Sequence, residues 1–465
     1  MRAKTVFLAA TAAIASACAH YTPAPIEVAS VATGRRAAAL DEPAIRAELI
    51  RLAPDYQWGG EWNGLTLFAA ALAQSPAIAA ARAGVAAAAA EARAARVAPG
   101  PTLTLTAEYA FNPAEASPWL VGAASDILLD IGGRRKGRIE AADVAARVAA
   151  FDYAASVWSV RMAIRRALDA EAGARETAAL AGALVKLRDR QFEAVRRRVT
   201  AGEESRLELD RVREGVAGAA QTEAMANADL AAARLDIAAA VGVSPDALDA
   251  TRIESFQTLA ETPGITEAQT SAALTARTEI LKAAAAYDQA EAALRVAVAS
   301  QYPDVSIGPG YMWERGLSKL PLALSLSFPS SDLGRAAIRA AQARRAEAGR
   351  RLESEVAGVL AGIARAAADY RAAWTSLQLI RMKTIPTAEA FARQADRELA
   401  AGAVNRADWA ASQAGLLTAQ LDEIAARRRV LEAQAALEDA LRQPLSGPET
   451  AIAPSFIEPV DPEFP

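Results

Sequence analysis

Very few side chains in this 465-residue chain could perform chemistry. The chain contains one cysteine, Cys18, and one histidine, His20. A single cysteine excludes a disulfide within the chain, and these two residues cannot supply a Cys- or His-rich metal site. The sequence has no glycine-rich dinucleotide loop, no P-loop and no nucleophile elbow. It therefore predicts a protein that is not an enzyme and that uses no cofactor or metal ion.

The remaining candidates flank two equivalent turns, and each turn has a glycine followed by two polar residues. They are Gly202, Ser205 and Glu208 at the first turn, and Gly402, Asn405 and Asp408 at the second. Such glycines favour a left-handed helix end, and polar residues three apart favour a capping box on the next helix. A second, compatible interpretation is that several copies of the chain form a tube of helices. Glu208, Asp210 and Asp408 of each copy would then form a ring that attracts cations at the open end of the tube.

The N-terminus has the order of an export signal. Arg2 and Lys4 precede apolar residues 6–14, and Ala15-Ser16-Ala17-Cys18 follows. We assign residues 1–17 to a secretory signal peptide. Its end resembles a lipoprotein cleavage site, so we expect Cys18 to be lipidated; the alternative is ordinary cleavage that leaves a free thiol. No later segment has about 20 continuous apolar residues, so a membrane crossing by the mature chain would require strands.

The chain contains the same unit twice. Residues 75–101 align without a gap with residues 277–303, and each copy leads into two alternating stretches, an Asp-x-Gly motif and a long Ala- and Arg-rich pattern. A period of about 200 residues is too long for a solenoid repeat. We predict a duplicated unit of helix, β-hairpin, long helix, turn and helix. The repeats are placed at 65–241 and 271–442, with irregular segments at 18–64 and 242–270 and a Pro-rich tail at 443–465.

Four stretches alternate between apolar and polar residues, as strands with one apolar face do. They form expected hairpins over 102–129 and 304–328, with strands at 102–111, 119–129, 304–314 and 320–328. Each is about ten residues long, which suits a tilted strand that crosses a bilayer. Free strand edges are not tolerated in lipid and small barrels need about eight strands, so closure requires several chains, and three would give twelve strands. A small soluble core beneath the hairpins is the alternative.

Helical patterns fill residues 133–200 and 334–400, and each would be about 100 Å long. Shorter helices are expected in pairs that together match each long one: 65–97 with 205–241, and 271–300 with 405–442. Pro386 is expected to kink the second long helix, with Ile385 as the weak point. The apolar stripes are mostly alanine, which buries little area. These helices therefore need neighbours along their full length, either in a tube that continues the barrel or in an isolated coiled coil.

Together these motifs resemble the outer-membrane efflux protein family, the TolC family, over nearly the whole mature chain. The resemblance rests on the far turns, on the prolines before each first strand, Pro101 and Pro303, and on the junctions after each hairpin. The junction residues are Asp130, Gly132 and Arg134 in the first half, and Asp332, Gly334 and Arg335 in the second. The resemblance implies a mainly α fold with a membrane β-barrel part. Three chains would form a twelve-stranded barrel and a periplasmic α-barrel of twelve helices.

The resemblance also implies roles for the turns. Gly202, Ser205, Gly402 and Asn405 would form the periplasmic tips that meet an adaptor protein, with Glu208 and Asp408 beside a gate. The family often has a further acidic residue three positions after the second of these, where this chain has Ala411. A double acidic ring is therefore a point at which this chain departs from the family.

The implied function is that of a passive outer-membrane exit duct of a tripartite efflux pump, anchored by lipid at Cys18 and extending into the periplasm. Its partners would be two further copies of the chain, an adaptor, an inner-membrane transporter of the RND type and outer-membrane lipid. The net charge of −4 gives no indication of nucleic-acid binding. The alternatives are the exit duct of a type I protein secretion system and a periplasmic coiled-coil scaffold or adaptor. Residues 130–136 resemble the form common in the heavy-metal cation branch, so metal cations are one candidate substrate and small organic drugs another.

Overall fold

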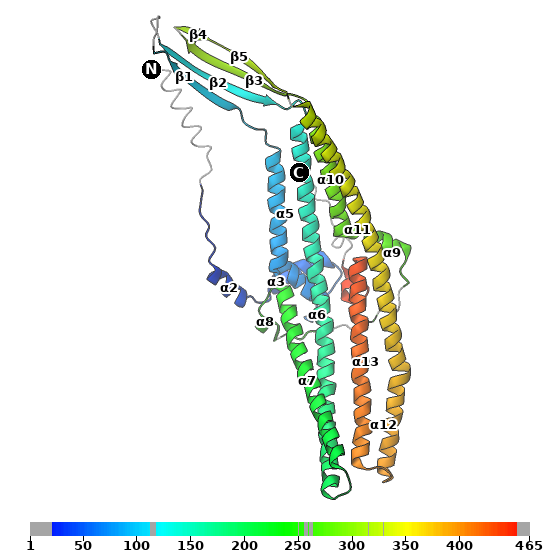
Figure 1. Ribbon diagram of the computed structural model, residues 1–465. Coiled ribbons are helices and arrows are strands. Elements are labelled where there is room, and N and C mark those ends of the chain that lie inside the picture. Colours follow the sequence, from blue (N-terminus) through cyan, green and yellow to red (C-terminus); the bar gives the residue numbers. More distant parts are fainter. Residues whose placement is uncertain are drawn as a thin grey trace.

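The structure, a computed structural model, describes residues 21–111, 118–249, 251–254, 259, 264–314, 316–328 and 330–452. The chain is elongated, with a sheet at one end, two helical tips at the other and short helices at mid-height (Figure 1). The expected signal peptide and Cys18 lie outside the described residues. The fold is mainly helical with a small sheet, as the sequence predicts.

The first half is built around α6 (Arg134–Thr200), a single helix of 67 residues. At 1.5 Å per residue it is about 100 Å long. α5 (Pro76–Ala95) lies along its upper part and α7 (Arg206–Val241) along its lower part (Figure 1). The buried side chains of α7 include Val212, Ala219, Ala226 and Ala233, which recur every seven residues. This spacing is that of a coiled-coil seam, and its small side chains allow α6 and α7 to pack closely.

The second half repeats this plan with an irregular long helix. α11 (Ser331–Leu379) continues through a π-helical turn, η1 (Ile380–Thr384), into α12 (Ile385–Ala400). The N–H of Ile385 donates to the carbonyl of Ile380, five residues back. Pro386 has no N–H and cannot make the ordinary helical bond, and the wider turn accommodates it. The irregularity expected at Ile385 is therefore a π-helical turn. α10 (Thr278–Ala299) lies along α11, and α13 (Arg406–Leu441) lies along α11, the π-helical turn and α12.

The prediction of a single helix over residues 65–97 was wrong. The structure has α4 (Gly64–Gln74) followed by α5, with Ser75 extended between them and a bend of 50°. Pro76 accounts for the break, because it starts a helix readily and disfavours helical geometry in the residue before it. Among the described residues no single helix is long and apolar enough to span a membrane, and this bent pair alone reaches that length and composition.

The helix expected at 271–300 is broken in the same way. α9 (Glu267–Ala276) ends and α10 begins on either side of Arg277, which is extended. Residues 75 and 277 are the first positions of the aligned repeats. The second break thus keeps the position of the first without its proline.

The strands form one antiparallel sheet at the end of the molecule. They are β1 (Thr102–Tyr109), β2 (Trp119–Leu129), β3 (Asp304–Glu314), β4 (Leu317–Lys319) and β5 (Leu322–Ser327). β2 of the first half pairs with β3 of the second, so that the two hairpins make one surface. β1 lies at one edge, and β4 and β5 lie at the other.

The fourth strand, expected to be continuous over 320–328, is divided between β4 and β5. Both pieces pair with β3 in one register, since Met312 lies opposite Lys319 and Pro309 opposite Leu322. Pro321 between them has no N–H to complete the ladder. Its carbonyl still accepts the N–H of Gly310 at 2.9 Å. The sheet therefore keeps four strand positions, as predicted.

One face of the sheet is apolar and uncovered. The register places Leu103 and Leu105 of β1 on the same face as Leu322 and Leu324 of β5. Leu324 is 62% exposed, and the others are more exposed still. A contiguous apolar surface of this kind marks a site of contact with protein or membrane.

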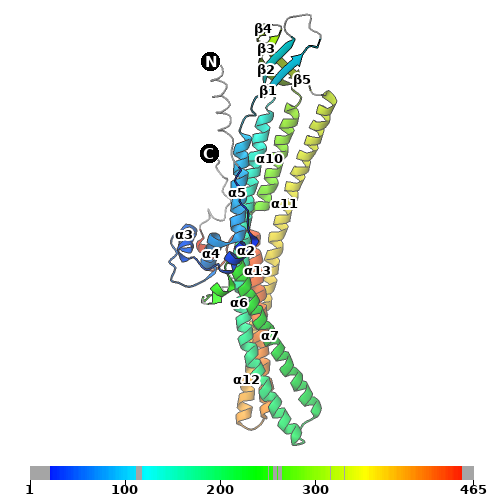
Figure 2. The same ribbon diagram turned by 90° about the vertical axis from the view of Figure 1, so that its left-hand side faces the viewer.

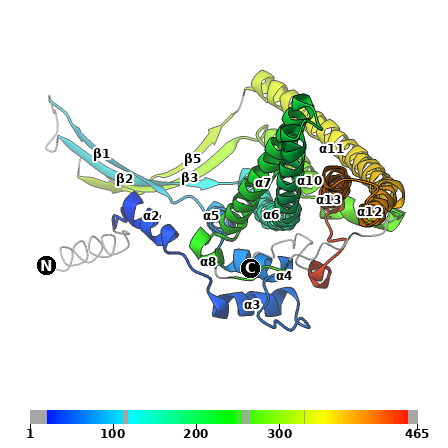
Figure 3. The ribbon, with the colours of Figure 1, turned by 90° about the horizontal axis from the view of Figure 1, so that it is seen from below.

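The main core lies at mid-height and to one side of the long helices (Figure 2). α3 (Glu42–Leu52) and α4 pack there against α6 and α7, and Leu52, Leu65 and Ile164 are completely buried. The short helices α8 (Pro245–Asp249) and η2 (Pro448–Ala451) complete this region, whereas α2 (Val28–Arg36) has no buried residue. Seen along the helices, α3 and α4 lie on one side of the bundle (Figure 3).

Candidate functional site

The first helical tip, where α6 turns into α7, depends on the backbone of Gly202. This residue has φ of 79° and ends α6 in a left-handed conformation. Its N–H donates to Val199 at 3.1 Å, and the N–H of Glu203 donates to Arg198 at 2.8 Å. These two bonds define a Schellman motif. A Cβ at Gly202 would meet nothing within 4 Å, so the turn requires glycine for its conformation and not for space.

The second tip, between α12 and α13, repeats this geometry. Gly402 has φ of 73°, its N–H donates to Leu399 at 3.1 Å, and the N–H of Ala403 donates to Glu398 at 2.8 Å. A Cβ at Gly402 would also lie in open space. The two tips are thus the same turn built twice.

The returning helices α7 and α13 begin at the expected capping residues. Ser205 Oγ accepts the N–H of Glu208 at 3.1 Å. Asn405 Oδ1 accepts the N–H groups of Ala407 and Asp408 at 2.8 and 3.0 Å. These bonds satisfy N–H groups that the helix itself leaves unpaired.

The acidic residues of the two expected capping boxes, Asp408 and Glu208, have different partners. Asp408 Oδ2 accepts the side-chain amide of Asn405 at 2.5 Å. Glu208 turns away and pairs with Arg211 at 3.1 Å. Asp210 pairs with Arg213 at 2.8 Å on the exposed surface. Within the described residues no group of three acidic, histidine or cysteine side chains could hold a metal ion. An acidic ring made by several chains stays a prediction.

The two tips lie against each other. Ala407, at the start of α13, packs with Ala194 and Val195 of α6. A cavity of about 420 Å³ lies between the tips and is lined by Arg198 and Asn405 among others. The far end of the chain therefore presents both turns as one surface.

Sequence reasoning missed the residue that holds the second tip together. Asp396 of α12 accepts the indole N–H of Trp409 at 2.8 Å and the amide of Gln413 at 3.0 Å, both from α13. Asp396 precedes Gly402 by six residues and Trp409 follows it by seven. This near-symmetry about the turn is the signal that could have identified the pair.

The first junction, between β2 and α6, links the two halves of the chain. Asp130 accepts the backbone N–H groups of Arg134 and Arg135 at 3.0 and 2.8 Å, and so caps the first turn of α6. Arg134 Nη1 lies 2.9 Å from Oδ2 of Asp304 at the start of β3. Gly132 packs closely on the end of α10, because a Cβ there would lie only 3.0 Å from the carbonyl oxygen of Ala299.

The second junction has the same motif but different contacts. Asp332 pairs only locally with Arg335, at 2.6 Å, and both side chains are largely exposed. Asp332 does not cap α11, which starts after Ser330 without a side-chain cap. A Cβ at Gly334 would meet nothing within 4 Å. Gly132 packs against the end of α10. Among the described residues of one chain, nothing occupies the equivalent place beside Gly334.

Sequence reasoning also missed a buried charge cluster at mid-height. Arg161 of α6 contacts Glu438 of α13 at 2.9 Å and also Glu449 of η2, and all three are almost completely buried. One turn further along α6, Arg165 Nε lies 3.2 Å from Oδ2 of Asp169. The helical spacing of these residues in the sequence is typical of a solvated face. The cluster instead ties the C-terminal segment to α6 and α13.

Comparison with known proteins agrees with this architecture. The sequence pattern of the family described as outer membrane efflux protein matches residues 67–243 and 270–441. No curated protein matches the sequence. The outer membrane protein VceC of Vibrio cholerae is 19% identical, with a TM-score of 0.66 over 82% of this chain and 96% of its own.

Two further solved structures are similar. CusC is 16% identical, with a TM-score of 0.67 over 84% of this chain and 96% of its own. The outer membrane channel MtrE of Neisseria gonorrhoeae, in its open state, is 19% identical with a TM-score of 0.65, over 81% and 88%. At these identities the likeness shows a shared fold. The two segments matched by the family pattern cover most of the chain and coincide with its two repeats. The predicted resemblance is thus confirmed, and the chain belongs to the outer membrane efflux protein family.

Proposed function

We propose that this protein is the outer-membrane exit duct of a tripartite efflux pump, through which small substrates leave passively. The main support for the proposal is the sheet, which has an exposed apolar face. Its two edges, β1 on one side and β4 with β5 on the other, lack a partner strand among the described residues. It stands on helices about 100 Å long. A sheet of this kind fits a membrane, and the helices fit a conduit beneath it.

The edges of the sheet require partner strands from further copies of the chain. Unpaired backbone groups at a strand edge cost several kcal/mol each in lipid, so β1 and the β4–β5 edge need partners. Four strand positions per chain are fewer than the roughly eight of the smallest barrels. We infer a homotrimer with twelve strand positions. Each chain also offers four helical columns: α6, α11 with α12, α5 above α7, and α10 above α13. Three chains then give a tube of twelve columns.

The internal duplication gives a specific contact between chains. Gly132 packs against the carbonyl of Ala299 at the end of α10, within the chain. The equivalent of Gly132 is Gly334, which has open space beside it, and the equivalent of Ala299 is Val97, which is 72% exposed. We place Gly334 of one protomer against Val97 of the next. The contact between chains then repeats the contact within the chain.

Engineered cysteines test this arrangement. The double variant Val97→Cys/Gly334→Cys, oxidised in membranes, is expected to run at two and three times the chain mass in a denaturing gel. The matched control is Val97→Cys/Gly358→Cys, because Gly358 also has open space around it but lies lower on α11. Cross-linking of the control to the same extent, or monomers only from the test pair, would contradict the proposed contact.

The remaining assignments follow the proposed duct. The tips at Gly202, Ser205, Gly402 and Asn405 would contact a periplasmic adaptor, and Glu208, Asp210 and Asp408 would lie around the opening. An inner-membrane transporter, expected to be of the RND type, would supply the energy. Cys18 would carry the lipid that anchors the mature chain in the outer membrane.

A deletion strain, with and without the complementing gene, tests the transport function. We expect increased susceptibility to a panel of divalent metals, to hydrophobic drugs or to both, restored by the intact chain. Sensitivity to metals alone would assign cation export, and sensitivity to drugs alone would assign export of organic compounds. Loss of a secreted protein without any change in susceptibility would contradict efflux and favour type I secretion.

A further inference from the structure

The acidic and basic side chains of the sheet all lie on one of its two faces. The register places the even-numbered residues of β1, β2 and β3 on the same face as the odd-numbered residues of β4 and β5. We call this face the polar face. Its acidic and basic residues are Glu108, Asp126, Asp304, Glu314 and Lys319. The opposite face, which has the exposed leucines, has no charged residue in these strands.

The polar face is also the face toward which the sheet bends. Gly122, Gly308 and Gly310, the glycines of these strands, all lie on it. A Cβ at Gly122, Gly308 or Gly310 would lie 3.3, 3.1 or 3.2 Å from a carbonyl oxygen of the neighbouring strand. Glycines at such positions allow a sheet to curve. A membrane barrel turns its apolar face to lipid and its polar face inward, so in the proposed duct the polar face lines the lumen.

Asp126 is the charged residue of this face that lies unpaired near the base of the sheet. Asp304 has Arg134 at 2.9 Å, and Glu314 has Lys319 at 2.5 Å. Asp126 is exposed, and its carboxylate has no ion pair or hydrogen bond within the part of the chain that the structure describes. Thr102 lies directly opposite it, and Ala124 precedes it by two residues on the same face. These neighbours carry no charge that could compensate the carboxylate.

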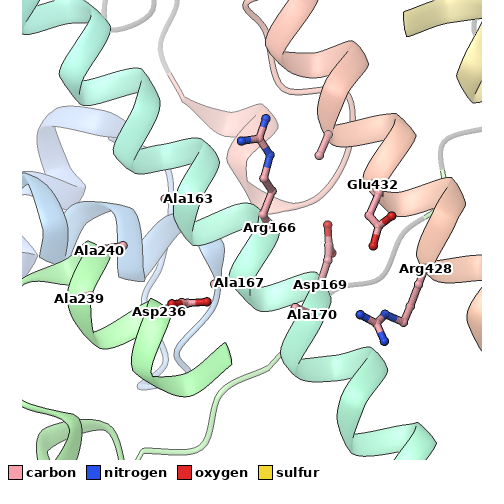
Figure 4. A pocket seen from close by; sticks show the side chains of 11 residues that line it. Ala163, Arg166, Ala167, Asp169, Ala170, Asp236, Ala239, Ala240, Arg428 and Glu432 are labelled. Carbon is pink, nitrogen blue, oxygen red and sulfur yellow. The ribbon is translucent and has the colours of Figure 1, made fainter. Parts of the chain in front are cut away.

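A cavity in the helical part of the chain provides a contrast. It has a volume of about 630 Å³ and lies at mid-height between α6, α7 and α13 (Figure 4). Its charged lining residues are Arg166, Asp169, Asp236, Arg428 and Glu432. Oδ2 of Asp169 also lies 3.2 Å from Nε of Arg165. Charges of both signs thus meet in this cavity, whereas Asp126 carries a negative charge without a paired cation.

We propose that Asp126 makes the barrel of the duct prefer cations over anions. Three copies of the chain would place three of these carboxylates at one level of the lumen, three residues above the end of β2. Glu108, one residue before the end of β1, would add negative charge at the other end of the same face. Small cations would be concentrated at this level and anions repelled. This role rests on the proposed duct.

The width of the barrel decides how far these charges act. Twelve strands about 4.8 Å apart and tilted by about 40° enclose a backbone radius of about 12 Å. The Debye length is about 10 Å at 0.1 M salt and about 3 Å at 1 M. The carboxylates should therefore influence ions across the lumen at about 0.1 M salt, and only ions close to the wall at about 1 M.

A cysteine beside Asp126 measures the local potential. Thr104 lies on the polar face, two residues along β1 from the partner of Asp126. Thr104→Cys, in the full-length protein in lipid vesicles, is treated with a trimethylammonium or a sulfonate methanethiosulfonate reagent. We expect the ratio of the cationic to the anionic rate, relative to that of a free thiol, to fall about fivefold in Thr104→Cys/Asp126→Asn. An equal ratio in both backgrounds would overturn the assignment.

Two controls belong to this measurement. The unchanged chain corrects for any reaction at Cys18. Leu105→Cys, the next residue of β1 and on the apolar face, should react with neither charged reagent. Reaction at position 105 without reaction at position 104 would place the apolar face in the lumen and would contradict the inference.

Reversal potentials in planar bilayers test the effect on ion flow. In a gradient of KCl around 0.1 M, Asp126→Asn should lower the permeability of K⁺ relative to Cl⁻, and Asp126→Lys should favour Cl⁻. Asp246→Asn, the same change at an exposed residue of α8, should leave the ratio unchanged. The difference between the variants should shrink at about 1 M salt.

The two possible failures have different signatures. A ratio that is the same in Asp126→Asn and in the unchanged protein, with normal conductance, would overturn the role of Asp126 and leave the duct intact. Absence of conductance in the unchanged protein would overturn the duct and this role together.

Discussion

Arg134 of α6 lies with its Nη1 atom 2.9 Å from Oδ2 of Asp304, the first residue of β3. The pair joins the long helix of the first half to the first strand of the second. Arg134 also donates to the carbonyl of Tyr302 at 3.4 Å, and Asp130 holds the backbone of the same turn. The sheet is thus fixed on the helices by a contact between the two repeats, and not only by covalent connection within each.

Loss of this contact should lower stability modestly. Both side chains are about one-third or more exposed, so Arg134→Ala is expected to cost at most about 1 kcal/mol. The measurement is the thermal midpoint of the purified protein. Arg335→Ala serves as the control, because its partner Asp332 is exposed and local. A larger loss in the control than in Arg134→Ala would contradict the assigned difference between the two junctions.

The turn glycines should tolerate substitution poorly because of conformation alone. Gly202→Ala and Gly402→Ala each place an L-residue in the left-handed region, at a cost of about 1–2 kcal/mol. Gly218→Ala is a matched control, since that glycine is within α7, has equally open space and should be neutral or slightly stabilising. Local opening of the tips, measured by hydrogen exchange, should increase only in Gly202→Ala and Gly402→Ala. Equal exchange in all three would remove the conformational role of these glycines.

The buried cluster makes a sharp prediction for Arg161. Replacing it with Met leaves Glu438 and Glu449 buried without their cation, which should cost about 3–5 kcal/mol. The triple variant Arg161→Met/Glu438→Gln/Glu449→Gln removes the stranded charges and should recover much of that loss. Thermal or denaturant unfolding measures both. A triple variant no more stable than the single one would show that packing, and not charge, sets the cost.

Asp169 should make stability depend on pH. Its pKa in the folded chain is about 6, above the ordinary value of 3.8. Between about pH 4 and 6 the unfolded chain loses this proton and the folded chain keeps it, so stability falls as pH rises. Asp169→Asn removes this effect. Its stability relative to the unchanged protein should therefore rise between pH 4 and 7.5, by up to about 3 kcal/mol.

Asp210→Asn is the control for this titration, because Asp210 lies on the exposed surface of the first tip. Its difference from the unchanged protein should stay constant over the same pH range. A constant difference for Asp169→Asn as well would mean that burial does not perturb its carboxyl group.

The strands and the long helices were predictable because their periodicity is long and regular. The sheet retains the four predicted strand positions, and the helices from 133–200 and 334–400 run nearly over their expected ranges. The left-handed turns at Gly202 and Gly402 also followed from the local sequence, since glycine at a helix end has few other roles.

What escaped prediction depends on contacts between distant segments. Arg161, Arg165 and Asp169 have the spacing of a solvated helix face, and only the return of the C-terminal segment buries them. The difference between the junctions escaped for the same reason, because Arg134 is paired by Asp304, 170 residues away. The break at Arg277 has no local signal, whereas that at Ser75 precedes a proline. Pro321 was visible, but its effect depends on the ladder with β3.

We propose that three copies of the chain close into one conducting duct. Native mass measurement and planar-bilayer recording on the same purified preparation test it most directly. We predict particles of three chains that give discrete, reproducible ion-conducting steps. A stable monomer or dimer as the only species, or trimers that enter the bilayer without conducting, would contradict a trimeric duct.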